Sequence, residues 1–249
     1  MSGHSKWHSI KHQKAVTDAR RGQLFTKLTR EIIVAVRNGG PNPDTNISLR
    51  LAVQRARDAS MPSDNIDRAI KRASGATEGA NLVEMVLEGY GPGGSAILVE
   101  ALSDNRNRTI QAVRNVFSRG GGSLGEAGCV AWQFDPKGVV TVQSEEMDTE
   151  ELALQAIDAG AEDVTVEASV VEVYTRPEDL EKVRAALEQE NVPVASAELS
   201  MVPKTTLELD EKAAVQTLRL MEKLDELDDV RHVSSNVDFA DEVLAKYQE

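Results

Sequence analysis

The chain has 249 residues, of which 41% are apolar and 4% aromatic, and its formal net charge is −13. This length allows two or three domains with cores of ordinary size, and no segment approaches the roughly 18 consecutive apolar residues of a membrane helix. The polar start lacks the apolar region of a secretory signal and the single cysteine excludes an intramolecular disulfide, so we expect a protein of the reducing cytoplasm.

The charge is divided unevenly along the chain. Residues 1–75 carry 14 Lys and Arg against 6 Asp and Glu, whereas the remaining residues carry 14 against 35. A basic end on an acidic protein favours oriented docking onto a polyanion, and nucleic acid is the partner we expect. An acidic surface also keeps a protein soluble, but solubility does not explain why the positive charge is collected at one end.

The first fourteen residues form a cationic arm with one tryptophan and no acidic residue. We expect its lysines to meet phosphates and Trp7 to stack on a base. Its histidines, spaced i, i+4 and i+8, could bind zinc, but the surrounding lysines oppose a dication, so we expect them to add hydrogen bonds or partial charge. The alternative is a disordered arm whose Trp7 docks on the following helices. The lysines are Lys6, Lys11 and Lys14, and the histidines are His4, His8 and His12.

Three amphipathic helices are predicted next, at about residues 17–37, 44–59 and 63–74. Leucine, isoleucine and valine recur at helical spacing in the first; Ile47, Leu51 and Val53 are the core candidates of the second, and Ser63 is the expected N-cap of the third. The predicted unit is a small bundle with basic outer faces. Its candidate phosphate ligands are Lys27, Arg30, Arg68, Lys71 and Arg72.

A different composition begins near residue 78. Two strands, 84–90 and 96–101, are predicted around the turn Gly91-Pro-Gly-Gly94, followed by a helix at 109–118 and a strand at 130–134. Arg106 and Arg108 stand just before that helix, where the free N–H groups of the helix start and the two cations could hold a phosphate. The alternative is a solvated loop with Asp104 or Asn107 as the cap.

The sequence pattern of residues 135–205 predicts a complete β-α-β-β-α-β unit of ferredoxin-like type. Its helices are expected at 148–159, with Asp148 as cap, and at 177–190, opened by Pro177. The tail adds a helix at 210–227 and a strand near 230–237, which are the elements that the segment before residue 135 lacks. We therefore expect an inserted domain, with sequential domains and a loose tail as the alternative.

No set of residues indicates an enzyme. Gly120–Gly125 matches G-x-G-x-x-G, but a helix precedes it and a strand follows, so it is interpreted as a loop. Cys129 lies in an apolar run and is expected to be an inert thiol. The acidic runs 145–151 and 225–229 are interpreted as solvated faces, or as contacts for a basic protein. We expect no catalytic residue, metal, cofactor or small-molecule substrate.

Five segments of the first half carry a resemblance to a known family. They are Gly3-His-Ser-Lys-Trp7 with Ile10-Lys-His12, Met61-Pro-Ser-Asp-Asn-Ile66, Tyr90-Gly-Pro-Gly-Gly94, Asp104-Asn-Arg-Asn-Arg-Thr109 and Gly128-Cys-Val-Ala-Trp-Gln-Phe134. On these segments the chain resembles the YebC/PmpR family, to which the mitochondrial translational activator of cytochrome oxidase also belongs. Because the resemblance begins near residue 3, we expect no mitochondrial presequence.

The resemblance implies a multi-domain α+β protein, with an amino-terminal three-helix bundle and two ferredoxin-like α+β domains, one inserted in the other. The corresponding boundaries are 1–76, then 77–134 together with 206–249, and the insert 135–205. It also implies a non-enzymatic regulator that binds DNA. Other members resemble translation factors that act at the ribosome, including on stalled proline-rich stretches.

Two functional hypotheses therefore stay open, with a pure protein-binding adaptor as a third. A DNA-binding regulator would grip duplex phosphates through the bundle, although no clear helix-turn-helix is present. A ribosome-associated factor would bind folded ribosomal RNA through the arm and the bundle, with Trp7 stacking on unpaired bases. An adaptor would leave the basic bundle unexplained. No membrane partner is expected, and the oligomeric state stays open.

Overall fold

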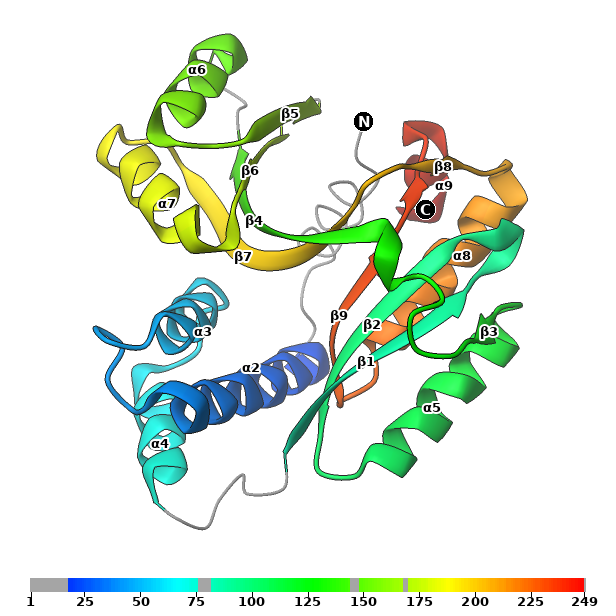
Figure 1. Cartoon of the computed structure of the whole chain (residues 1–249), viewed down its shortest axis with the longest axis horizontal. Helices are drawn as coiled ribbons and strands as arrows, with labels where there is room; N and C mark the ends of the chain where they lie inside the picture. The colour runs from blue at the N-terminus through cyan, green and yellow to red at the C-terminus, as the bar shows by residue number, and fades with distance from the viewer. Residues whose placement is uncertain (1–17, 76–81, 144–147, 168–169, 249) are drawn as a thin grey trace.

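A computed structural model of the chain describes residues 18–75, 82–143, 148–167 and 170–248 (Figure 1). Three helices come first and pack together: α2 (Asp18–Gly39), α3 (Ile47–Asp58) and α4 (Ser63–Ser74). Two four-stranded antiparallel sheets follow, each with helices on one face. The multi-domain α+β fold is therefore confirmed.

One buried asparagine sets the turn between α2 and α3. Asn46 caps α3 by accepting the N–H of Leu49 at 3.0 Å, and its amide donates to the carbonyls of Ala35 at 2.7 Å and Gly40 at 2.8 Å. A Cβ on Gly39 would lie 2.6 Å from the Asn46 side chain, so only glycine allows this close approach. The asparagine thus fixes the angle at which α3 leaves α2.

Two expectations for this bundle are wrong. Ile47, a core candidate, is 57% exposed, and Leu49 takes the buried place, because α3 begins only at Ile47 and the buried face starts two residues later. Ser63 is the first residue of α4, the N-cap position is taken by Pro62, and no side chain caps this end. Leu51 is buried as expected, but it packs outside the bundle, into the core formed by residues of the segment 135–205.

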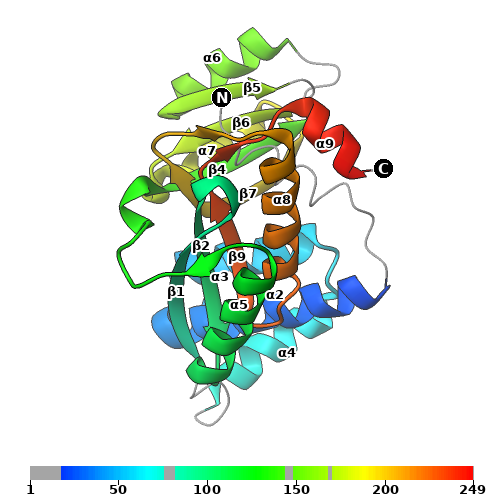
Figure 2. The same ribbon diagram turned by 90° about the vertical axis from the view of Figure 1, so that its right-hand side faces the viewer.

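The first sheet has the strand order β3-β1-β2-β9. Its strands are β1 (Val83–Tyr90), β2 (Ala96–Ser103), β3 (Ser123–Leu124) and β9 (Val230–Ser235). The helices α5 (Arg106–Arg119) and α8 (Glu211–Asp225) cover one face, where Val113, Phe117 and Leu218 are fully buried (Figure 2). The hairpin β1–β2 turns through the 3-10 segment η1 (Pro92–Gly94).

The expected strand at 130–134 is absent from the described chain, which makes the 3-10 turn η2 (Ala131–Gln133) there instead. The buried carboxylate of Glu88 causes the turn, since it accepts the N–H groups of Gly128, Val130 and Ala131 at 2.6–2.8 Å. These bonds outweigh the effect of burial and lower the pKa of Glu88. The chain then leaves the turn as the ten-residue strand β4 (Phe134–Gln143).

The second sheet has the order β5-β6-β4-β7 and the chain order β-α-β-β-α-β, as expected for a ferredoxin-like unit. Its elements after β4 are α6 (Thr149–Ala159), β5 (Asp163–Glu167), β6 (Val170–Thr175), α7 (Leu180–Gln189) and β7 (Val194–Pro203). Asp148 caps α6 as predicted, accepting the N–H of Glu150 at 2.9 Å. A 3-10 turn, η3 (Pro177–Asp179), takes the place of the first expected turn of α7.

The tail returns to the first sheet. After β7 come β8 (Leu207–Glu208), α8, β9, β10 (Val237–Asp238) and α9 (Asp241–Gln248), and β9 pairs with β2. The long strands β4 and β7 pair along their whole length, from Phe134 opposite Pro203 to Val142 opposite Val194, and so join the two units. This topology supports the division into 77–134 with 206–249 and the insert 135–205, which stays a prediction.

Candidate nucleic-acid interface

The arm of the expected interface lies outside the residues that the structure describes. The expectations for its three lysines, its three histidines and its tryptophan are therefore carried forward unchanged. These residues are Lys6, Lys11, Lys14, His4, His8, His12 and Trp7. The chain is described from Asp18, where α2 begins.

The outer face of α4 gathers exposed cations. Ile66 and Ala69 bury the opposite face against the bundle, so Arg68, Lys71 and Arg72 point to solvent. They occupy little more than one helical turn, about 6 Å along the axis. Arg68 is steadied by a hydrogen bond from its Nε to the carbonyl of Asp64 at 3.0 Å and by a bond to the amide oxygen of Asn65. Three of the five bundle cations that the sequence indicates thus share one exposed surface.

Lys27 and Arg30, the other two, face the first-sheet unit. The Lys27 ammonium donates to the carbonyl of Asp225 and lies 3.9 Å from its carboxylate. Arg30 donates to the carbonyl of Asp228 at 2.7 Å and to the Asp229 carboxylate at 3.0 Å. Because these contacts occupy both cations, we no longer place them among the candidate phosphate ligands. The acidic run 225–229 is correspondingly an internal docking site for α2, which corrects its interpretation as a solvated face.

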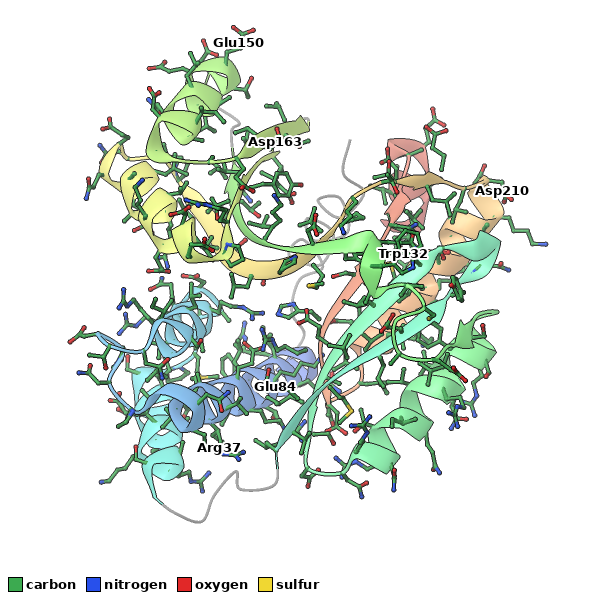
Figure 3. The ribbon with its side chains drawn as sticks, in the orientation of Figure 1. Arg37, Glu84, Trp132, Glu150, Asp163 and Asp210 are labelled. Carbon is green, nitrogen blue, oxygen red and sulfur yellow. The ribbon has the colours of Figure 1, made fainter. Side chains whose placement is uncertain are left out.

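The C-terminal end of α2 is attached to the same unit. Arg37 donates to the carbonyl of Leu82 at 3.2 Å, and the Asn38 amide donates to the carboxylate of Glu84 at 3.4 Å (Figure 3). Polar contacts therefore hold α2 at its middle and at its C-terminal end. The bundle is docked on the first sheet in one orientation, so the outer face of α4 is presented in one direction.

Arg106 and Arg108 lie inside α5, which begins three residues earlier than the sequence predicts. The cap is Asn105, whose side chain accepts the N–H of Arg108 at 3.1 Å, so neither expected cap is used. Arg108 donates to Asp104 at 2.7 Å and to Asp229 at 2.9 Å. It therefore serves an internal ion pair, and Arg106 alone of the two keeps an exposed position free for an anion.

Asp229 is the carboxylate that these cations share, since both Arg30 and Arg108 donate to it. Burial opposes its ionisation, but hydrogen bonds from Thr109 at 2.7 Å, from Arg108 and from Ser103 at 3.1 Å outweigh burial and lower the pKa of Asp229. Since the same carboxylate also accepts from Arg30, it connects α2 with the start of α5. Asp229 is thus a structural acid rather than a ligand-binding one.

A second ionic cluster, centred on Arg55 of α3, joins the helical bundle to the units of the first and second sheets. Its Nη1 donates to Glu31 of α2 at 2.8 Å and to Nε2 of His232 on β9 at 3.1 Å, and its Nη2 lies 3.3 Å from Glu198 on β7. A guanidinium only donates, so Nε2 of His232 must carry the lone pair. Burial lowers the pKa of Arg55, but the surrounding carboxylates outweigh it and raise that pKa overall. Sequence reasoning missed this residue, because its partners lie far away in the chain.

The single cysteine, Cys129, is partly buried. Burial and the nearby Glu88 carboxylate raise the pKa of its thiol, which disfavours the reactive thiolate and supports the prediction of an inert thiol. Its carbonyl accepts hydrogen bonds from the Tyr90 hydroxyl at 3.0 Å and from the indole of Trp132 at 3.2 Å. Trp132 is nevertheless 68% exposed and lies at the turn between the first sheet and β4 (Figure 3).

Over the described residues there is no group of three or more His, Cys, Asp and Glu side chains placed to hold a metal ion. None of the helices described there is long and apolar enough to cross a membrane. Arg57, in the last turn of α3, is also exposed and belongs to the bundle surface. The sequence offered only its charge as a signal.

Comparisons with known proteins agree over nearly the whole chain. Residues 5–76 match the family model described as the TACO1/YebC protein N-terminal domain, and residues 82–237 match the model of the TACO1/YebC second and third domain. A protein of Dehalococcoides mccartyi named "Probable transcriptional regulatory protein" is 59% identical over 247 residues, covering 99% of this chain and 98% of that protein.

Two more distant relatives extend the comparison. A protein of Natranaerobius thermophilus with the same name is 49% identical, over 98% of this chain and 99% of its own. The crystal structure of a conserved hypothetical protein from Aquifex aeolicus is 47% identical and superposes with a TM-score of 0.86, covering 93% of this chain and 96% of that one.

Proposed function

This chain belongs to the TACO1/YebC family, and from that premise we propose that it is a nucleic-acid-binding regulatory protein without enzymatic activity, a DNA-binding transcriptional regulator of the kind named among its relatives. We place its site of action in the cytoplasm. The observation that carries the proposal is the exposed set Arg68, Lys71 and Arg72, which lies within about one turn of α4.

The arrangement of charge supports oriented binding. The acids that follow residue 75 outnumber the cations by 35 to 14, so a polyanion is repelled from most of the molecule and attracted to the bundle. Because polar contacts fix α2 to the first-sheet unit at its middle and at its C-terminal end, the α4 face is presented at a fixed angle. Phosphate contacts of this kind position a protein on nucleic acid, whereas sequence is read by contacts to base edges.

A second candidate function is a translation factor that binds ribosomal RNA. The arm favours it, because Trp7 among lysines suits stacking on an unpaired base. Both candidates use the same cationic surface, and they differ in the polymer that it meets.

Crosslinking in cells separates the two. We would map crosslinks from the full-length protein to DNA and to RNA, and measure co-sedimentation with ribosomes at low and high salt. Footprints on promoters without ribosome association are the expected result for a transcriptional regulator. Crosslinks confined to ribosomal RNA would contradict that function and favour the second. Crosslinks to neither polymer would contradict both.

A further inference from the structure

A groove opens between α5 and α8 on the outer side of the first sheet, away from the helical bundle's core. It has a volume of about 580 Å³, and Figure 2 looks onto this face, where the two helices lie together over the sheet. Its lining comes from the end of α5, from the turn that follows it and from the middle of α8. The lining residues are Val116, Arg119, Gly120, Gly121, Gln216, Arg219, Leu220 and Lys223.

Two glycines shape the floor of the groove. A Cβ on Gly120 would lie 2.8 Å from a methyl carbon of Leu220, so the chain passes closer to α8 than any other residue allows. Gly121 has a φ of 79°, the left-handed conformation that turns the chain away after α5. The result is an apolar floor, made by Val116 and Leu220, between two helical walls.

The rim of the groove is cationic. Arg119 stands on one wall, Arg219 and Lys223 on the other, and all three are exposed. No lining residue is acidic. Lys223 reaches Glu226 at 3.7 Å, but that pair is 69% and 46% exposed and such pairs contribute little, so a ligand can displace it. In a unit that is otherwise acidic, this concentration of positive charge is complementary to an anionic ligand.

We propose that the α5–α8 groove binds single-stranded nucleic acid, with phosphates on Arg119, Arg219 and Lys223 and an unpaired base over the apolar floor. This proposal rests on the proposed function in one respect, that the partner is a nucleic acid. It adds a second contact on a different unit, so that one strand could be held both at the bundle and at the groove.

Three observations favour a single strand over other polyanions. The volume is that of a small-ligand pocket and accommodates one nucleotide. Two of the three rim cations are arginines, whose planar guanidinium groups stack on bases as well as pair with phosphates. A duplex keeps its bases stacked inside and would leave the apolar floor empty, and an acidic peptide, whose carboxylates could pair with the arginines, brings no flat ring to cover that floor.

The test uses the full chain with Arg119→Ala, Arg219→Ala and Lys223→Ala, called the groove variant. Binding is followed by fluorescence anisotropy with a labelled oligo-uridylate of about 12 nucleotides, a length within the usual site sizes. We expect affinity to fall roughly tenfold near 0.1 M salt and the salt slope to become shallower by about 2, from about 0.7 per phosphate contact.

The matched control removes three exposed cations of the inserted unit, through Arg176→Ala, Lys182→Ala and Lys204→Ala. It changes the net charge equally and should bind like the wild type. Circular dichroism checks that both variants fold. Wild-type affinity and slope in the groove variant would overturn the proposal. Equal losses for an RNA duplex and for poly-glutamate would also overturn it, by indicating an unspecific polyanion surface.

The bundle is tested separately, so that the two failures can be told apart. A variant with Arg68→Ala, Lys71→Ala and Arg72→Ala reports on the proposed function. If this variant binds normally while the groove variant is impaired, the groove stands without the bundle. If only the bundle variant is impaired, the groove proposal fails and the proposed function is unaffected.

Discussion

Replacing Arg55 with methionine should destabilise the protein more than any other single change of a surface-reaching cation. The guanidinium is the only positive group within hydrogen-bond distance of both Glu31 and Glu198 among the described residues, and these carboxylates come from α2 and β7. Methionine keeps the length of the side chain and most of its packing but removes the charge. The substitution would therefore remove this charge from two buried carboxylates, of which Glu31 keeps a longer, 4.0 Å contact with Arg231.

The expected loss is about 3 kcal/mol of unfolding free energy at pH 7. Removing one partner of a buried ion pair costs about 3–5 kcal/mol, because the remaining charge stays out of water. The Arg55 side chain is 20% exposed, against 7% for each carboxylate, so water partly screens the site and the lower end of the range applies.

Urea unfolding followed by circular dichroism at about pH 7 measures this loss. Arg57→Met is the matched control, since Arg57 lies two residues along the same helix and is exposed. It should change the free energy by less than about 0.5 kcal/mol. Adding Glu198→Gln to Arg55→Met should recover part of the loss, because one of the orphaned charges is then removed.

Two results would refute this reasoning. The first is a loss at neutral pH no larger than that of Arg57→Met. The second is a loss of the expected size that Glu198→Gln does not reduce, because lost packing rather than buried charge would then be the cause.

Asp229→Ala should cost about 1.5–3 kcal/mol through the loss of charge-assisted hydrogen bonds. Because the folded-state pKa of Asp229 is lowered, its contribution to the unfolding free energy is present above the ordinary aspartate pKa and should disappear as the pH falls below that range. Thermal unfolding at several pH values would reveal this dependence, and a cost that does not change with pH would contradict it. Burial, together with neighbouring carboxylates, raises the pKa of Glu100, so Glu100→Gln should raise the melting temperature at about pH 8 and have no effect at about pH 4. A melting temperature that falls at the higher pH would count against this. Changing Lys6, Lys11 and Lys14 to Ala should make the salt slope of nucleic-acid binding shallower by roughly 2–3, and an unchanged slope would mean that the arm is not a contact.

Local patterns predicted most of the elements, because helical periodicity and turn residues act over a few neighbours. The caps show the limit of this reasoning. Asp148 caps α6 as its spacing indicates. The cap of α5 is Asn105 rather than a neighbour, and the turn at 131–133 depends on Glu88, which lies more than forty residues earlier. A run of apolar residues gives no sign of such a distant carboxylate.

The sequence predicts that the bundle is basic, but it does not predict which of the basic side chains face solvent. Periodicity places Lys27 and Arg30 opposite the apolar stripe of α2, and an exposed face is the simplest inference from that position. In the fold, the acidic segment 225–229 covers this face and engages both cations. The α4 cations stay exposed. Sequence separation of about 200 residues hides this difference.

The central claim is that the outer face of α4 binds the phosphates of nucleic acid. The most direct test compares the wild type with the Arg68→Ala, Lys71→Ala, Arg72→Ala variant in binding to duplex DNA and to ribosomal RNA over a range of salt concentrations. If each cation meets a phosphate, the salt slope should become shallower by about 2–3 on the polymer that the protein recognises. An unchanged slope on both polymers would contradict the claim.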